Sequence, residues 1–157
     1  MSGRRGFGDE SWRLAKAGES SALHRAADLL LEGDPAGLLY DGHRARAFAL
    51  ALEHRVDEAL AELNEGWTEE WPFPAGYAAD IARVRYLAGD YEQSLGALRL
   101  AVHGADRLDP AISELVAAVV GRAPRLRLHA VKVMLGGGSA WQRLRNAAAA
   151  ASASARN

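Results

Sequence analysis

The residues best able to do chemistry in this chain are five histidines and a larger set of carboxylates. The histidines are His24, His43, His54, His103 and His129. His24 lies four residues before Asp28, and His54 lies four residues before Glu58, so each pair would share one face of a helix and offer two metal ligands. A zinc site needs at least three protein ligands. We therefore expect ordinary His–carboxylate pairs and no metal site.

The sequence also lacks the motifs of common enzyme classes. It contains no P-loop, no G-x-G-x-x-G, no G-x-S-x-G and no H-E-x-x-H pattern. The absence of cysteine excludes disulfides, thiolate metal sites and a cysteine nucleophile. Neighbouring carboxylates such as Asp57 and Glu58 point apart on a helix, which does not indicate a glycosidase pair. We expect a non-enzymatic protein without a cofactor; an enzyme or accessory subunit that uses His43 or His54 is the disfavoured alternative.

Charge divides the chain into two unlike parts. Its 157 residues are 49% apolar and 25% charged, the balance of one globular domain. The net charge is −1, but all twenty acidic residues lie at or before Glu114. The basic segment that follows contains Arg122, Arg125, Arg127, Lys132, Arg143 and Arg145. These charges are too sparse to favour nucleic acid.

Localisation is inferred from what the sequence lacks. The N-terminus has no apolar stretch of the kind found in a signal peptide, and no apolar run approaches the roughly 20 residues that span a bilayer. We expect a cytoplasmic protein for which membrane binding is disfavoured. The abundance of Ala and Arg suggests a bacterial source.

Breaker residues divide the chain into segments of helix length. Val56, Ala59 and Leu63 illustrate the spacing of an apolar helix stripe, and Asp109 before Pro110 is typical of a helix start. The predicted helices span 9–17, 20–32, 38–53, 55–66, 75–88, 91–104, 110–120 and 124–135, with a candidate ninth at 140–151. The connections between them are short, so consecutive helices should form antiparallel hairpins.

The hairpin turns recur at a nearly constant interval. Gly18, His54, Gly89 and Gly121 each occupy a predicted tight turn, and their separations are 36, 35 and 32 residues. This interval is close to the roughly 34 residues of a helix–turn–helix repeat.

The segment 81–101 resembles a tetratricopeptide repeat. The resemblance rests on Ala82, the turn Gly89-Asp90-Tyr91, Ser94, Leu98 and Ala101. The preceding unit matches moderately at Ala47, Val56, Ala59 and Leu63, and the first unit matches at Gly18, Leu23, Ala27 and Leu30. The fourth unit matches poorly because Pro124 interrupts the start of its second helix. The resemblance implies an all-α fold of tandem antiparallel helix hairpins, a short right-handed α-solenoid, over residues 1–135. Residues 136–157 would form a Gly/Ala-rich basic tail, flexible or with a short helix.

In tetratricopeptide proteins the first helix of each pair lines a concave groove. The resemblance therefore implies that a partner would contact Trp12, Arg44, Phe48, Arg83 and Tyr86. Aromatic residues and arginine are enriched at binding hot spots, and this set would suit a peptide with an acidic group. Alternatively, Phe48 and Tyr86 pack between repeats while the arginines pair with neighbouring acids.

A second candidate interaction patch follows the second hairpin and consists of Trp67, Trp71 and Phe73. Pro72 and Pro74 bias the preceding residues toward extended backbone, so this stretch cannot be helical throughout. Exposed, the aromatic rings would form an interaction loop. Folded back, they would cover the gap left by a long connection.

The basic segment admits several structures and roles. Residues 124–129 alternate apolar and polar side chains as a strand does, but a lone strand would leave an unpaired edge, so we predict a helix that caps the last repeat. We expect residues 140–157 to be a mobile tail. The predicted function is a non-enzymatic scaffold or adaptor that binds a peptide or protein segment in the groove; the alternative is a homo-oligomer assembled through repeat ends or the basic segment.

Overall fold

The computed structural model describes residues 3–33, 39–67, 74–103, 109–136, 148–149 and 151–152, with side chains from Glu10 in the first range and from Gly76 in the third. Every regular element in these residues is helical, and they contain no strand. The predicted all-α class is therefore confirmed. The chain divides into two compact units, unit 1 (Met1–Pro72 with Leu87–Gly89) and unit 2 (Phe73–Tyr86 with Asp90–Asn157).

Each unit contains four α-helices, counted within the described residues. Those of unit 1 are α1 (Gly3–Lys16), α2 (Ser20–Glu32), α3 (Leu39–Leu52) and α4 (Val56–Gly66). Those of unit 2 are α5 (Pro74–Leu87, except its last residue), α6 (Tyr91–Val102), α7 (Pro110–Arg122) and α8 (Arg127–Met134), with the short 3-10 helix η1 (Pro124–Leu126) before α8. Most predicted ends agree to within one or two residues, but α1 begins six residues before its predicted start. The predicted helix at 140–151 lies mostly outside the described residues.

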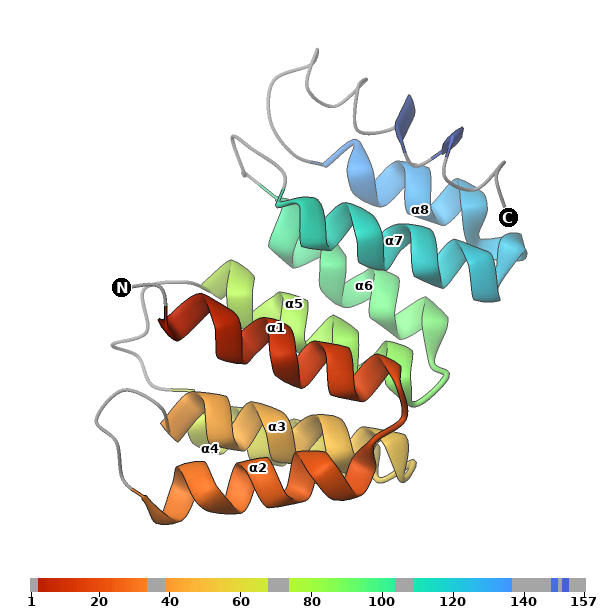
Figure 1. Ribbon diagram of the computed structural model, residues 1–157. Coiled ribbons are helices and arrows are strands. Elements are labelled where there is room, and N and C mark those ends of the chain that lie inside the picture. Colours follow the sequence, from red (N-terminus) through yellow and green to blue (C-terminus); the bar gives the residue numbers. More distant parts are fainter. Residues whose placement is uncertain are drawn as a thin grey trace. The chain divides into compact units, whose positions relative to one another are not determined.

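In unit 1, helix α3 contacts α1, α2 and α4 (Figure 1). Its sequence is rich in alanine, and side chains on most of its surface are buried. Small side chains let neighbouring helices approach closely. At Gly42 on α3 an added Cβ would lie 2.8 Å from Leu31 Cγ of α2, so a larger residue would push these helices apart. α3 is therefore the centre of this unit.

Three helix joints have left-handed backbone, at Gly18 (φ 75°), His54 (φ 60°) and Gly89 (φ 83°). In each joint the amide of the following residue donates to a carbonyl five residues earlier, for example Arg55 N to Leu50 O at 2.9 Å. These bonds satisfy carbonyls at the helix end, as in the Schellman motif. The turns predicted at these three positions are thus confirmed.

The turn predicted at Gly121 is wrong. Gly121 lies inside α7, which continues to Arg122, and the joint falls at Ala123 (φ −135°) directly before Pro124. At the other end of α7 the prediction holds, since the carboxylate of Asp109 accepts from Ala111 N at 2.9 Å and Pro110 opens the helix. The start of α7 could thus be predicted from its capping residues. The end could not be predicted from Gly121, because the helix continues through this glycine.

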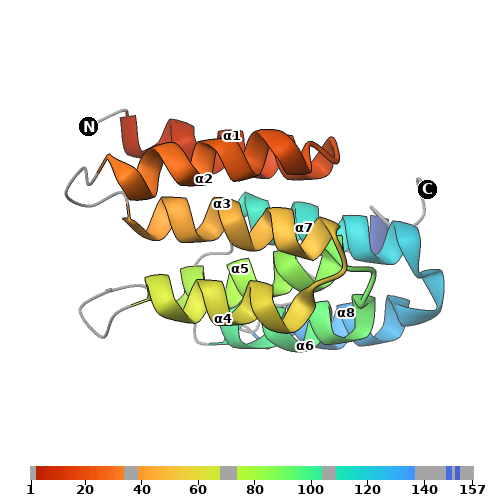
Figure 2. The same ribbon diagram turned by 90° about the horizontal axis from the view of Figure 1, so that it is seen from below.

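In unit 2, helix α6 contacts both α7 and α8, and Figure 2 shows α6 beside α8. Fully or almost fully buried side chains in these helices include Leu95, Leu98, Val116, Val119, Val133 and Met134. The segment after Pro124 is helical, which confirms the predicted helix over the strand alternative. Its buried residues Leu126, Ala130 and Val133 follow helical spacing. None of the helices in the described residues combines the length and the apolar character needed to span a bilayer.

Candidate functional site

The two arginines predicted to face a partner are each held by an acid on their own helix. Arg44 Nη2 donates to Asp41 Oδ1 at 2.6 Å, and Arg83 Nη1 donates to Asp80 Oδ1 at 2.9 Å. Both guanidinium groups are largely covered, with side chains 14% and 18% exposed. Their charges are therefore locally compensated, as the alternative interpretation of the sequence expected.

The three aromatic residues predicted for the groove have different environments. Phe48 is completely buried on α3, and its ring meets that of Trp12 edge to face, with centroids 5.7 Å apart. The expectation that Phe48 faces a partner is therefore wrong. Helix α3 is the central helix of unit 1, so the large side chain of Phe48 packs against neighbouring helices. In unit 2, Tyr86 is half-buried with its ring 5.7 Å from that of Tyr91.

Of the predicted aromatic patch, the structure describes only Trp67. It follows α4 directly, is half-buried, and its backbone amide donates to Leu63 O at 3.0 Å. Trp71 and Phe73 lie outside the described residues, so the interaction patch stays a prediction.

Within the predicted basic segment, Arg122, Arg125, Arg127 and Lys132 are all exposed. Arg143 and Arg145 lie outside the described residues. Lys132 differs from the other three because it lines a cleft to which another helix contributes further basic side chains.

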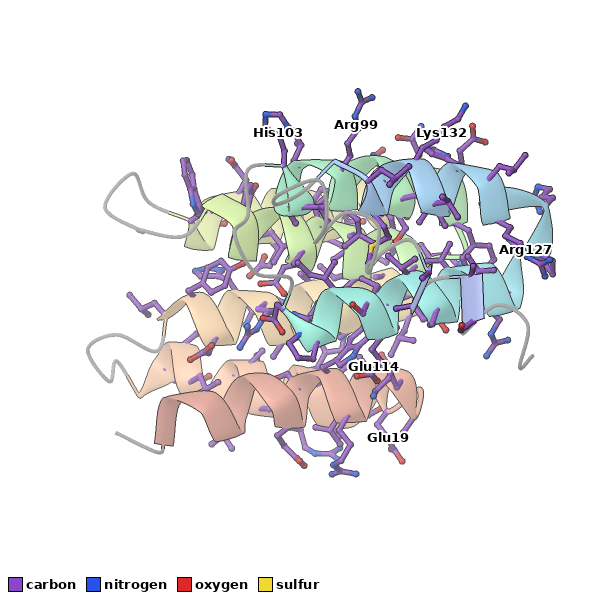
Figure 3. All side chains as sticks on the ribbon, turned by 90° about the horizontal axis from the view of Figure 1, so that it is seen from above. Glu19, Arg99, His103, Glu114, Arg127 and Lys132 are labelled. Atoms are coloured by element: carbon purple, nitrogen blue, oxygen red, sulfur yellow. The ribbon has the colours of Figure 1, made fainter. Side chains whose placement is uncertain are left out.

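A cleft of about 380 Å³ lies within unit 2 where α6 meets α8. It is lined by Arg99, His103, His129, Lys132, Val133, Leu135 and Gly136. Figure 3 shows Arg99 and His103 projecting on the same side of the unit as Lys132, with Arg127 at a different end of α8. Among the residues that the structure describes, the lining thus combines four basic side chains with two apolar ones and contains no acid. We call this the basic cleft.

The electrostatics of the basic cleft favour an anion. Within the described part of the chain, neither Arg99 nor Lys132 forms an ion pair with an acidic side chain. Both lie in the last turn of their helix, where a cation is stabilised by the partial negative charge of the helix end. The partial negative charge of a helix end explains why one cation lies in the last turn of each helix. It does not explain why two histidines lie beside these cations. A carboxylate or phosphate could accept charge-assisted hydrogen bonds from this set.

From the sequence, Lys132 was singled out as part of the basic segment, His103 and His129 were named only among the five histidines, and Arg99 was not singled out. Arg99 and His103 are at the end of α6, whereas His129 belongs to α8, two helices later. No local spacing connects them. The signal available in the sequence was the basic residue in the last turn of each helix.

One of the two predicted His–carboxylate pairs has a different partner in the structure. His24 Nε2 lies 2.8 Å from Glu53 Oε1 instead of contacting Asp28, which binds Arg46. The Ser20 hydroxyl, first, and then the His24 ring hold the pKa of the Glu53 carboxyl below its ordinary value. This contact joins the start of α2 to the end of α3.

A second histidine contact joins α3 to α4. His43 Nδ1 lies 2.7 Å from Glu62 Oε1, and both side chains are mostly covered. Glu65, one turn further along α4, brings a second carboxylate to the same place. Sequence reasoning missed this group because His43 and Glu62 are far apart in the chain and belong to different helices.

Comparison of the chain with protein-family models, with curated proteins and with solved structures finds no match in any of the three. The class of the protein is therefore given by its fold, an all-α protein in which neighbouring helices pack together.

Proposed function

We propose that this chain is a non-enzymatic interaction module related in architecture to tetratricopeptide repeats, which binds an acidic segment of a partner protein. The architecture is supported by three left-handed joints at similar intervals along the chain. It is also supported by the packing in unit 1, where α2 contacts α1 and α3 and the two first helices, α1 and α3, contact each other. Repeat proteins of this kind act as rigid scaffolds for extended ligands.

The basic cleft is the observation that carries the proposed specificity. Its four basic residues converge from two helices, and Val133 and Leu135 supply apolar surface beside them. An acidic peptide would place carboxylates against Arg99 and Lys132 and an apolar side chain against Leu135. Because the acceptor and both donors would be charged, these hydrogen bonds should be stronger than those between neutral groups.

The arginines first predicted for the groove contribute less to this proposal. Arg44 and Arg83 already have acidic partners and are mostly covered, so a ligand would have to displace an existing ion pair to use them. Of the predicted groove residues, the half-buried Trp12 of unit 1 and the half-buried Tyr86 of unit 2 each remain a candidate for a separate further contact.

Fluorescence anisotropy with a labelled peptide tests the proposal. The probe is a short Asp/Glu-rich peptide with interspersed leucines, and its control has Gln and Asn in place of the acids. We expect the acidic peptide to bind more tightly, and the double substitution Arg99→Gln/Lys132→Gln to weaken binding by at least about tenfold, equivalent to about 1.4 kcal/mol. Raising the salt concentration should weaken it further.

The matched control is Arg122→Gln/Arg125→Gln, which removes the same charge from exposed positions outside the cleft. This variant should keep most of the affinity. Equal losses of affinity in both double variants would show that binding depends on the net charge of the protein and not on the cleft. Equal affinity for the two peptides would contradict an acidic ligand.

A homo-oligomer is the second candidate, favoured by the exposure of Arg122, Arg125 and Arg127 in a chain whose acids all precede them. In that case the basic residues of one copy would meet acidic residues of another. Light scattering at low and high salt separates the two, since a charge-driven oligomer should dissociate as screening increases.

A further inference from the structure

We infer a second binding site, in unit 1, for a divalent transition-metal ion of the zinc type, held by His43, Glu62 and Glu65. Ligand atoms of these three side chains lie within 4.8 Å of one another. Within the described residues this is the one group of three or more such side chains that converges in this way. The site is separate from the basic cleft and does not depend on the proposed function.

Two helices position the three ligands. Glu62 and Glu65 are three residues apart on α4, so their side chains share one face, and His43 reaches them from α3. Gly66 follows directly, and a Cβ there would lie 2.7 Å from His43 Cβ. The glycine therefore lets the end of α4 approach the histidine closely enough for both carboxylates to reach its ring.

The donor set suits zinc better than magnesium or calcium. Imidazole nitrogen is a ligand of zinc and related transition metals, whereas magnesium and calcium prefer all-oxygen sites. Zinc binds histidine and carboxylate at about 2.0–2.2 Å, which places the ligand atoms of a tetrahedral site about 3.4 Å apart. Glu65 is exposed and has room to close this distance. Three protein ligands would leave one position for water.

The ion would replace an interaction already present. In the structure His43 Nδ1 and Glu62 Oε1 are joined by a hydrogen bond of 2.7 Å. A metal at Nδ1 replaces this hydrogen bond: a neutral imidazole then holds its one proton on Nε2, and an imidazolium releases its Nδ1 proton to solvent. Arg46 Nη1 lies 3.5 Å from the same Glu62 oxygen and its other nitrogen binds Asp28, so a positive charge at the edge of the site opposes the incoming cation.

The contact between His24 and Glu53 provides an internal control. It has almost the same length as the His43–Glu62 contact and joins two helices in the same unit. Its carboxylate already accepts from the Ser20 hydroxyl and from Arg55, and no third ligand converges on it among the residues described. It should therefore bind zinc no better than an ordinary surface pair.

Equilibrium dialysis of the full chain without a purification tag tests the site, with Zn²⁺ as the probe and Mg²⁺ as the competing ion. We expect one tightly bound Zn²⁺ per chain that excess Mg²⁺ does not displace. Glu65→Gln should weaken binding at least tenfold, and its exposed position makes it harmless to the fold. Glu53→Gln should leave the affinity within about twofold, and Arg46→Gln should increase it. Circular dichroism confirms that each variant remains helical.

Ring nitrogen resonances of a ¹⁵N-histidine sample identify the ligand directly. Zn²⁺ should shift the signal that is lost in His43→Gln and leave the His24 signal in place. The inference is overturned if the wild-type chain binds no stoichiometric Zn²⁺, if Glu53→Gln weakens binding as much as Glu65→Gln, or if the shifted resonance belongs to another histidine. None of these results depends on binding of the acidic peptide.

Discussion

The hydroxyl of Ser94 donates a hydrogen bond of 2.7 Å to the carbonyl oxygen of Ala82, and both residues are completely buried. Ser94 belongs to α6 and Ala82 to α5, so the bond ties the two helices of one hairpin together inside unit 2. Two small side chains make the close approach possible, while the bond satisfies a hydroxyl that would otherwise be buried without a partner.

Substitution of Ser94 should separate the two effects of this contact. Ser94→Ala removes the hydrogen bond but keeps the space, and we expect a loss of about 1 kcal/mol in the free energy of unfolding. Ser94→Leu adds volume where the helices touch and should cost more, about 1–3 kcal/mol beyond that loss. Urea unfolding followed by circular dichroism measures both. A leucine variant as stable as the alanine variant would show that the helices are not in close contact.

At the left-handed joints, we expect introducing a glycine and removing one to have opposite effects on stability. His54 has φ 60° although it carries a side chain, whereas Gly89 has φ 83° at the equivalent joint. His54→Gly should therefore stabilise the protein and Gly89→Ala should destabilise it, each by about 1 kcal/mol. A Cβ at Gly89 would meet no atom within 4 Å, so conformational strain alone is tested there. Thermal melting gives both values, and changes of the same sign would contradict the assigned backbone.

The close approach at Gly66 predicts a large effect from one added methyl group. In Gly66→Ala the new Cβ would collide with His43 Cβ, which should cost about 1–3 kcal/mol. Gly96→Ala is the matched control, because Gly96 lies within α6 and nothing is within 4 Å of its Cβ position. In that variant the free energy of unfolding should increase by about 0.5–1 kcal/mol, because alanine has a higher helix propensity than glycine. Denaturant midpoints distinguish the two, and similar midpoints would argue against the tight contact.

We expect the carboxylate of Glu53 to make the stability of the protein depend on pH. Its pKa is lowered in the folded state, so its stabilising effect is present above the ordinary value of 4.5 and is lost as the pH falls through the folded-state value. Glu53→Gln should thus destabilise the protein at pH 7 and have a smaller effect near pH 3. Urea unfolding of both proteins at the two pH values measures this, and a constant difference would show that the ionised carboxylate is not involved.

Helix positions were largely predictable because they depend on local features. The apolar spacing and flanking breakers placed α2 at 20–32, as the structure has it. The start of α1 was missed because Gly3, Gly6 and Gly8 have low helix propensity, and the helix forms despite them. Gly121 was misjudged for the same reason, since helix α7 continues through it.

The candidate sites were less predictable because their residues come from different helices. The ion pairs of Arg44 and Arg83 follow from spacings of three residues and were anticipated as an alternative. The group of His43 with Glu62 and the basic cleft required knowledge of which helix faces lie together. Burial of Phe48 likewise depended on α3 being the central helix of its unit, which no local pattern reveals.

The joints at Gly18, His54 and Gly89 have a consequence for how quickly the chain folds. Each connects helices that follow one another directly, so their packing requires the closure of only a short loop. Short closures lose little chain entropy before contacts form, and helical proteins dominated by such contacts fold in microseconds to milliseconds. During synthesis, the hairpin of α3 and α4 can therefore form as soon as its second helix has emerged from the ribosome, well before the basic segment is translated.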